Sequence, residues 1–200
     1  IINHLVERGS CCQYFFIRHD DRTKRSLSLL LRSIAFQLAT SVPAMMHRIE
    51  ELVDEAIDFE TVDPRIIWDR VFKSIILKWE YEQAVYWIID GLDEAQDFRA
   101  VVKTLTDIAS STVPLRILFT SRRTPDIQSM LERSAQSFPS ATIQIEGHLE
   151  DLRRHVEEEL VVPGSVEFKR EIEQRIVEGA QNNFLVSRTH YPCSKFLRTR

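Results

Sequence analysis

The feature that most constrains the fold of this 200-residue chain is an apolar run that ends in acidic residues. Residues 85–89 are V-Y-W-I-I, and the next five are D-G-L-D-E. Continuous apolar runs of this length are typical of strands buried on both faces of a parallel sheet. A hairpin at Asp90 and Gly91 is excluded, because the residues that follow have a helical period and supply no second strand. The run therefore predicts a strand inside a parallel sheet, followed by a helix.

Strands and helices are predicted to alternate along the rest of the chain. Apolar period, length and flanking turn residues predict further strands at residues 11–18, 115–121 and 141–146. Helices are predicted at residues 26–38, 44–58, 64–77, 98–110, 125–133, 149–160 and 166–180, and residues 1–6 have the spacing of a helix end. This alternation predicts an α/β fold, with a parallel sheet flanked by helices and followed by the start of a helical domain.

Composition and charge exclude several other classes of protein. The net charge of −4 provides no basic field for nucleic acid or anionic lipid. The apolar runs are too short to cross a bilayer, and the first residues lack a signal-peptide pattern. Three cysteines, two of them adjacent, do not make a disulfide framework. We therefore expect a cytoplasmic protein with no membrane partner and no nucleic-acid partner.

Three carboxylates are expected at the ligand-binding edge of the sheet. Ligands of parallel α/β sheets bind beyond the carboxyl ends of the strands, where Asp90, Asp93 and Glu94 are placed. Clustered carboxylates repel one another unless a positive group is present. A magnesium ion with nucleotide phosphates supplies that charge, and the other acids can polarise an attacking water. The plainer alternative is that Asp90 and Gly91 form only a turn before a helix.

A second polar group follows the next predicted strand, in the segment I-L-F-T-S-R-R. Its arginines, Arg122 and Arg123, are also expected at the carboxyl edge of the sheet. An arginine at this edge can bind a terminal phosphate through charge-assisted hydrogen bonds. Two arginines after a strand are otherwise most simply a solvated surface. Their position one helix after the acidic turn favours the phosphate interpretation.

The remaining reactive residue types show no functional pattern. The six histidines have no His-x-x-x-His spacing, and no Cys-x-x-Cys pair occurs. Cys11 and Cys12 are expected to be small apolar residues of a strand, because no basic helix start lies beside them. The stretch 187–200 has no apolar period, so we expect a disordered tail there rather than a basic nucleic-acid arm.

Several of these stretches together resemble the NACHT family of signal-transducing P-loop NTPases. V-Y-W-I-I-D-G-L-D-E-A matches the family's Walker B pattern, and L-R-I-L-F-T-S-R-R resembles its sensor 1 strand. C-C-Q-Y-F-F-I-R-H-D-D and L-L-L-R-S-I-A-F-Q-L are similar to the segment after the P-loop helix in fungal, nephrocystin-type members. The resemblance covers residues 1–186, with looser similarity in the helices after the sheet.

The resemblance implies a role for each candidate residue. Asp90 would bind magnesium and, together with Arg122, the nucleotide, while Asp93 and Glu94 would be the catalytic acid pair. The implied cofactors of the intact protein are Mg²⁺ and ATP or GTP. The implied function is a nucleotide-dependent switch that self-associates through its NACHT domain, between an N-terminal effector and C-terminal repeats. Fungal members are associated with non-self recognition and regulated cell death.

One element of the family's site does not occur in this sequence. No G-x-x-x-x-G-K-[ST] loop is present to cradle the phosphates with backbone N–H groups and a lysine. We therefore expect a fragment that is inactive as an NTPase by itself. Its expected parts are a NACHT-type core at residues 1–147, the start of a helical domain at 148–186, and a disordered or non-native tail at 187–200. Two other functions stay open: an AAA-like ATPase that remodels protein or nucleic acid, and an interaction module without nucleotide.

Overall fold

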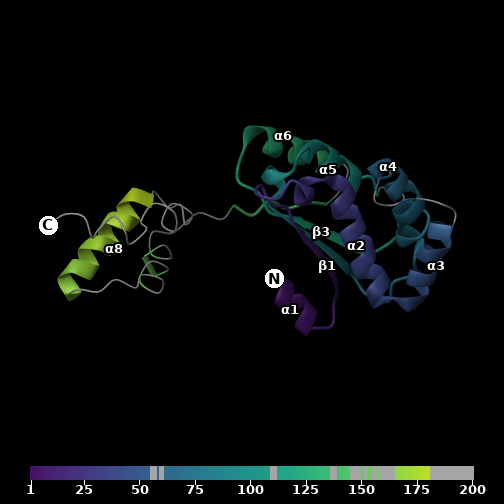
Figure 1. Ribbon diagram of the computed structural model, residues 1–200, viewed down its shortest axis with the longest axis horizontal. Coiled ribbons are helices and arrows are strands. Elements are labelled where there is room, and N and C mark those ends of the chain that lie inside the picture. Colours follow the sequence, from purple (N-terminus) through teal and green to yellow (C-terminus); the bar gives the residue numbers. More distant parts are fainter. Residues whose placement is uncertain are drawn as a thin grey trace. The chain divides into compact units, whose positions relative to one another are not determined.

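Three parallel strands form the centre of the fold in the computed structural model of the chain (Figure 1). The structure describes residues 1–54, 58, 61–108, 112–135, 139–144, 150, 153, 154, 157 and 165–180. The chain divides into two units, Ile1–Ser140 and Ala141–Arg200. The strands and the candidate residues all belong to the first unit, so that unit is the one that positions the site.

The sheet has the order β1-β2-β3, with β1 at Cys11–Phe16, β2 at Val85–Asp90 and β3 at Leu115–Phe119. Both pairings are parallel, and their registers align Phe16 with Asp90 and Ile89 with Phe119. The carboxyl ends of the three strands therefore meet at one edge of the sheet. The α/β class with a parallel sheet and flanking helices, predicted from the sequence, is confirmed.

Helices connect and cover the strands. The α-helices are α1 (Ile2–Glu7), α2 (Leu27–Ser41), α3 (Pro43–Asp54), α4 (Pro64–Ile67), α5 (Phe98–Leu105), α6 (Pro125–Ser134) and α8 (Val166–Ala180). Short helical turns lie at Thr23–Arg25, Trp68–Lys73, Ile76–Lys78 and Leu92–Glu94. Side-chain caps start the helices on either side of the site, because Ser26 accepts from the Leu29 N–H and Asp97 accepts from the Ala100 N–H.

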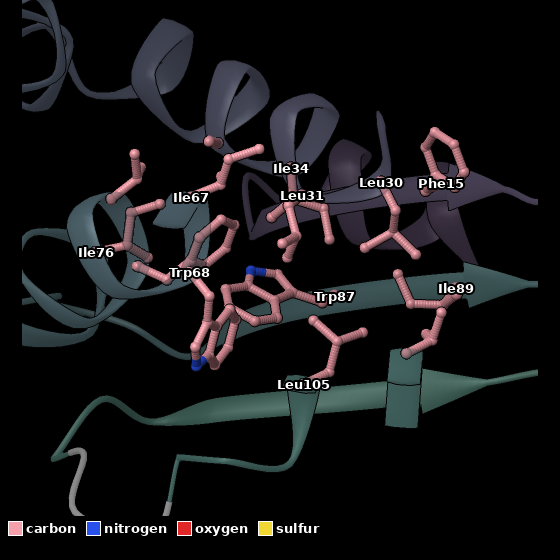
Figure 2. Close-up of a cluster of buried hydrophobic side chains, with 14 of the residues drawn as sticks. Phe15, Leu30, Leu31, Ile34, Ile67, Trp68, Ile76, Trp87, Ile89 and Leu105 are labelled. Carbon is pink, nitrogen blue, oxygen red and sulfur yellow. The ribbon is translucent and has the colours of Figure 1, made fainter. Parts of the chain in front are cut away.

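One face of the sheet carries the hydrophobic core. Trp87 of β2 is 1% exposed and lies between α2, which contributes Leu31 and Ile34, and Leu105 of α5 (Figure 2). The Phe72 ring meets Trp87 edge to face, with the ring centroids 5.5 Å apart. Large aromatic side chains of this kind contribute much of the apolar burial that stabilises a small domain. The core therefore fixes β2, and with it the acidic turn that follows β2.

The other face of the sheet is only partly covered. Tyr14 and Phe16 of β1 are 39% and 47% exposed, and Leu118 of β3 is 36% exposed. Ile88, between them on β2, is 5% exposed. The apolar run of β2 is thus buried as its sequence predicts, whereas β1 alternates between buried and exposed positions from Gln13 onward, and β3 alternates between half-buried and exposed positions.

The structure corrects three predicted elements. Residues 141–144 of the predicted strand 141–146 form no strand; Ile143 is 84% exposed and none of these residues pairs with a neighbouring strand, which a strand needs for its backbone hydrogen bonds. The strand predicted at 115–121 ends at Phe119, because Thr120 turns its backbone and side chain toward the acidic turn. The helix predicted at 64–77 widens after Ile67 into a π-helical turn, in which Trp68, Val71 and Phe72 are all buried.

Other predictions fall on residues outside the described part of the chain. The domain boundary placed near Gly147, the tail at 187–200 and most of the helix predicted at 149–160 lie there. The predicted helix 166–180 corresponds to α8. Within the described residues, the structure contains no helix that is both long enough and apolar enough to cross a membrane.

Candidate functional site

The candidate site lies at the edge of the sheet where the three parallel strands end. Asp90 is the last residue of β2, Ile17 follows β1, and Thr120 follows β3. The Ile17 N–H donates to the Asp90 carbonyl at 2.9 Å, and the Thr120 N–H donates to the Ile89 carbonyl at 3.0 Å. These two bonds continue the sheet ladder past the last paired residues. They place the loops after β1 and β3 on either side of the acidic turn.

Thr120 holds the first acid of the turn. Its hydroxyl donates to Asp90 Oδ1 at 2.5 Å and accepts from the Gly91 N–H at 3.1 Å. Its carbonyl accepts from the Leu92 N–H at 2.9 Å, and the Leu92 side chain is fully buried. These three contacts join the ends of β2 and β3, about thirty residues apart in sequence, so the orientation of the Asp90 carboxylate is set by β3 as well as by β2.

Gly91 allows the chain to turn sharply beneath the loop after β1. Its φ of +76° lies in the left-handed region, which glycine adopts without steric cost. A Cβ atom at this position would lie 2.9 Å from the carbonyl oxygen of Ile17. The close approach of these two backbones explains why glycine, rather than any residue with a side chain, separates Asp90 from Leu92.

Asp93 forms an ion pair with Arg122. Its Oδ1 accepts from the Arg122 N–H at 2.9 Å, and its Oδ2 accepts from the Arg122 Nε at 2.5 Å. Burial alone would raise the pKa of the Asp93 carboxyl, but the hydrogen bonds and positive charge of Arg122 outweigh burial and hold this pKa below its ordinary value of 3.8. Asp93 is therefore ionised at neutral pH, and the Asp93 bond raises the pKa of Arg122 in turn.

Glu94 turns toward the opposite side of the site, to the loop after β1. Its Oε2 accepts from the backbone N–H of His19 at 2.7 Å. Its carbonyl accepts from the Arg25 Nε at 3.1 Å, and the Arg25 carbonyl accepts from the Gln96 N–H at 3.0 Å. The acidic turn is thus tied to residues 17–25 on one side and to residues 120–122 on the other.

An open pocket of 520 Å³ adjoins Asp90. It runs along the outer edge of β1, where the Gln37 side chain bonds to the Tyr14 backbone, and its lining residues are Tyr14, Phe15, Phe16, Ile17, Arg18, Lys24, Ser33, Gln37 and Asp90. The cations Arg18 and Lys24 form exposed ion pairs with Asp20, at 2.7 Å, and Asp21, at 3.8 Å. Arg18, Lys24 and Thr120 are not among the site residues predicted from the sequence. The signals available for them were the basic residues after β1, namely Arg18 and the run R-T-K-R at 22–25, and the hydroxyl directly after β3.

The structure brings all four predicted site residues to one edge of the sheet. Asp90, Asp93 and Arg122 are linked through the loop after β3, while Glu94 contacts the loop after β1. The Arg123 side chain bonds elsewhere, because its Nε donates to the side-chain oxygen of Gln128 in α6 at 3.3 Å. The four residues are therefore adjacent, but Arg122 alone of the two arginines contacts the acidic turn through its side chain among the described residues.

Magnesium fits this set of residues in one respect. Asp90 Oδ1 is taken by Thr120, whereas no residue in the described ranges donates to Oδ2. Magnesium takes one or two carboxylate oxygens and completes its shell with phosphate oxygens and water, so a single free oxygen suits it. A metal held by protein ligands alone is a poorer fit, because the described residues contain no group of three His, Cys, Asp or Glu arranged for one.

The adjacent cysteines carry no functional signal. Cys11 and Cys12 are free and half-buried on β1. Burial raises the pKa of the Cys12 thiol, with a further contribution from Cys11. A raised pKa suppresses the thiolate, the reactive form, so the thiol lacks the property of a nucleophile.

Comparison with known proteins identifies relatives of this part of the chain. The family model described as Nephrocystin 3, N-terminal matches residues 1–122, which include Asp90, Asp93, Glu94 and Arg122. The vegetative incompatibility protein HET-E-1 of Podospora anserina is 28% identical over 126 residues. These residues are 62% of this chain and 9% of that protein, so the chain spans less than a tenth of the length of this curated relative.

Proposed function

Because the chain belongs to the nephrocystin 3 N-terminal family, we propose that it supplies the magnesium-binding and phosphate-binding edge of a nucleotide-dependent signalling switch. The family match and the similarity to HET-E-1 confirm the NACHT-type relationship predicted from the sequence. HET-E-1 is named for vegetative incompatibility. By analogy, we place the proposed switch in non-self recognition or cell-death signalling.

The observation that carries this proposal is the convergence of Asp90, Asp93, Glu94 and Arg122 at the carboxyl edge of β2 and β3. Three acids and one arginine at this edge have the charge pattern that a magnesium–phosphate group requires. A purely structural turn would need Gly91 and a capping acid, but not a second and third carboxylate directed to different loops.

Each residue has a separate part in the proposed reaction. The free oxygen of Asp90 holds magnesium, oriented by the Thr120 hydroxyl. Bound magnesium would neutralise phosphate charge and polarise the terminal phosphoryl group. Asp93 and Glu94 are the acid pair that serves hydrolysis, with Glu94 placed to orient water, and Arg122 binds the phosphate that is transferred. The nucleotide is ATP or GTP.

The wider role is part of the same proposal. The switch self-associates through this domain in the cytoplasm, between an N-terminal effector and C-terminal repeats. Hydrolysis needs the G-x-x-x-x-G-K-[ST] element that this sequence does not contain, so we propose that these residues act with that element rather than alone.

The experiment that tests the proposal compares two substitutions in a version of the chain preceded by a G-x-x-x-x-G-K-[ST] segment. Glu94→Gln keeps magnesium–ATP binding and stalls hydrolysis, because it removes a charge from water activation and none from the metal. Asp90→Ala weakens magnesium-dependent binding itself. Asp126→Asn, at an exposed ion pair with Arg99, is the control and changes neither. Identical losses for Glu94→Gln and Asp90→Ala, seen by calorimetry and phosphate release, would contradict the assigned roles.

A second candidate function is an interaction module that binds no nucleotide. It is favoured by one observation: protein donors already occupy both oxygens of Asp93 and one oxygen each of Asp90 and Glu94. In that case the acidic turn would be a purely structural joint between the loops after β1 and β3. Magnesium–ATP would then bind no better to the P-loop version than to the same protein with Asp90→Ala.

A further inference from the structure

Arg122 is held from one side only. Asp93 accepts hydrogen bonds from the backbone N–H and the Nε of Arg122. The side chain of Asp93 is 9% exposed, whereas that of Arg122 is 73% exposed. No residue in the described part of the chain accepts from Nη1 or Nη2. The guanidinium group is therefore fixed through its inner nitrogen, while its two outer nitrogens are left for another acceptor.

This geometry is the one that anion binding by arginine needs. The planar guanidinium binds phosphate through two parallel N–H bonds, and fixing the plane in advance lowers the entropy lost on binding. The exposed pair of Arg99 with Asp126 is arranged differently, because there an outer nitrogen, Nη2, donates to the carboxylate at 3.0 Å. Arg99 thus uses one of its outer nitrogens in its ion pair, whereas Arg122 uses only Nε.

We propose that Asp93 is a positioning residue, which holds Arg122 by the backbone N–H and Nε so that the two outer nitrogens bind a phosphate group. The proposal rests on the proposed function and divides the acid pair of that function in two. Glu94 acts on water, and Asp93 acts through Arg122. Both oxygens of Asp93 accept a hydrogen bond from Arg122 and its side chain is only 9% exposed, so Asp93 is poorly placed to bind a water, which separates its role from that of Glu94.

The effect of Asp93→Asn on anion binding distinguishes a positioning role from that of a simple negative charge beside the site. If Asp93 were simply a negative charge beside the site, Asp93→Asn would remove repulsion and strengthen the binding of an anion. If Asp93 positions Arg122, the same substitution weakens anion binding, because asparagine has a single acceptor oxygen for the two donors of Arg122 and directs an N–H₂ group at the other, so the guanidinium is held less firmly. The two readings of the residue therefore predict opposite changes.

The test titrates inorganic pyrophosphate, without metal, into the 200-residue chain and its variants. We expect Asp93→Asn to weaken pyrophosphate binding about tenfold, the scale of one lost charge-assisted hydrogen bond. Arg122→Gln should weaken it at least as much, and the double variant should bind no more weakly than Arg122→Gln alone. Asp126→Asn removes an equal charge from the exposed Arg99–Asp126 pair and is the matched control, with no weakening expected.

A second measurement does not depend on any ligand. In nitrogen-15 spectra of the chain without nucleotide, the Arg122 Nε–H should exchange slowly with water and lose this protection in Asp93→Asn, while the dispersion of the backbone amides shows that the variant is folded. Tighter pyrophosphate binding by Asp93→Asn, or unchanged Nε–H exchange, would overturn the positioning role. Absence of pyrophosphate binding by the unaltered chain would overturn the phosphate contact of Arg122. The magnesium role of Asp90 and the hydrolysis role of Glu94 are tested separately, by comparing Asp90→Ala with Glu94→Gln in the version that carries the P-loop segment.

Discussion

The Thr120 hydroxyl donates to the carboxylate of Asp90 across the boundary between β3 and β2, with 2.5 Å between the two oxygens. The same hydroxyl accepts from the Gly91 N–H at 3.1 Å. One side chain at the end of β3 therefore satisfies both an acceptor and a donor of the acidic turn. The carboxylate that we propose as the magnesium ligand is therefore oriented by a residue that lies outside the D-G-L-D-E motif.

Thr120→Val tests this relationship. Valine has the same shape but no hydroxyl, so Asp90 Oδ1 and the Gly91 N–H lose their partner at a half-buried position. We expect the free energy of unfolding to fall by about 1–3 kcal/mol, measured by urea denaturation. Thr120→Ser keeps the hydroxyl and is the matched control. A valine variant as stable as the serine variant would show that the hydroxyl has no part in holding the turn.

Gly91→Ala is expected to destabilise the chain by more than about 1 kcal/mol, because the new Cβ combines a left-handed backbone with a 2.9 Å contact to Ile17 O. The control is Gly9→Ala. Gly9 has a φ of +68°, but a Cβ there would have no heavy atom within 4 Å. Thermal unfolding of both variants separates the backbone strain, which they share, from the steric contact, which only Gly91→Ala introduces. Equal losses of stability would mean that the approach of Ile17 is unimportant.

The Asp93–Arg122 pair predicts a loss of stability in acid. The pKa of Asp93 in the folded chain lies below its ordinary value of 3.8, so its contribution is fully present above that value and is lost as the pH falls through the lower, folded pKa. The stability difference between the unaltered chain and Asp93→Asn should therefore be constant from pH 7 to about pH 5 and shrink below about pH 3.8. Urea titrations at several pH values measure this difference. A difference that grows on acidification has the wrong sign for this pair.

Glu94 is expected to protect the loop after β1 from proteolysis. Its Oε2 accepts from the His19 N–H at 2.7 Å, within a loop that offers trypsin Arg18, Arg22, Lys24 and Arg25. Glu94→Ala removes the acceptor and should raise the rate of cleavage in this loop several-fold, on the scale of one lost hydrogen bond of about 1 kcal/mol. Glu94→Gln keeps a side-chain oxygen and should stay close to the unaltered rate. Mass spectrometry of the early fragments locates the cut, and equal rates for the two variants would exclude the His19 contact as the cause.

The fold was largely predictable because its main signals are local. The apolar run of β2, the Ser26 cap of α2 and the period of α5 each follow from a few consecutive residues. The strand expected at 141–146 was wrong for its described residues, since apolar alternation alone does not supply a pairing partner. The widened turn after Ile67 was also missed, because a helical period does not distinguish an α-helix from a π-helical turn.

The sequence by itself determined that acids and arginines would meet at one edge of a parallel sheet, because strand direction and the position of a motif after a strand are enough to place them. Only the tertiary structure decided which atoms contact one another: Thr120 with Asp90, Arg122 with Asp93, and His19 with Glu94. These contacts join residues 29 to 75 positions apart. Their geometry depends on the register of three strands and on the packing that fixes it, and neither property is encoded in the spacing of residues along a single segment.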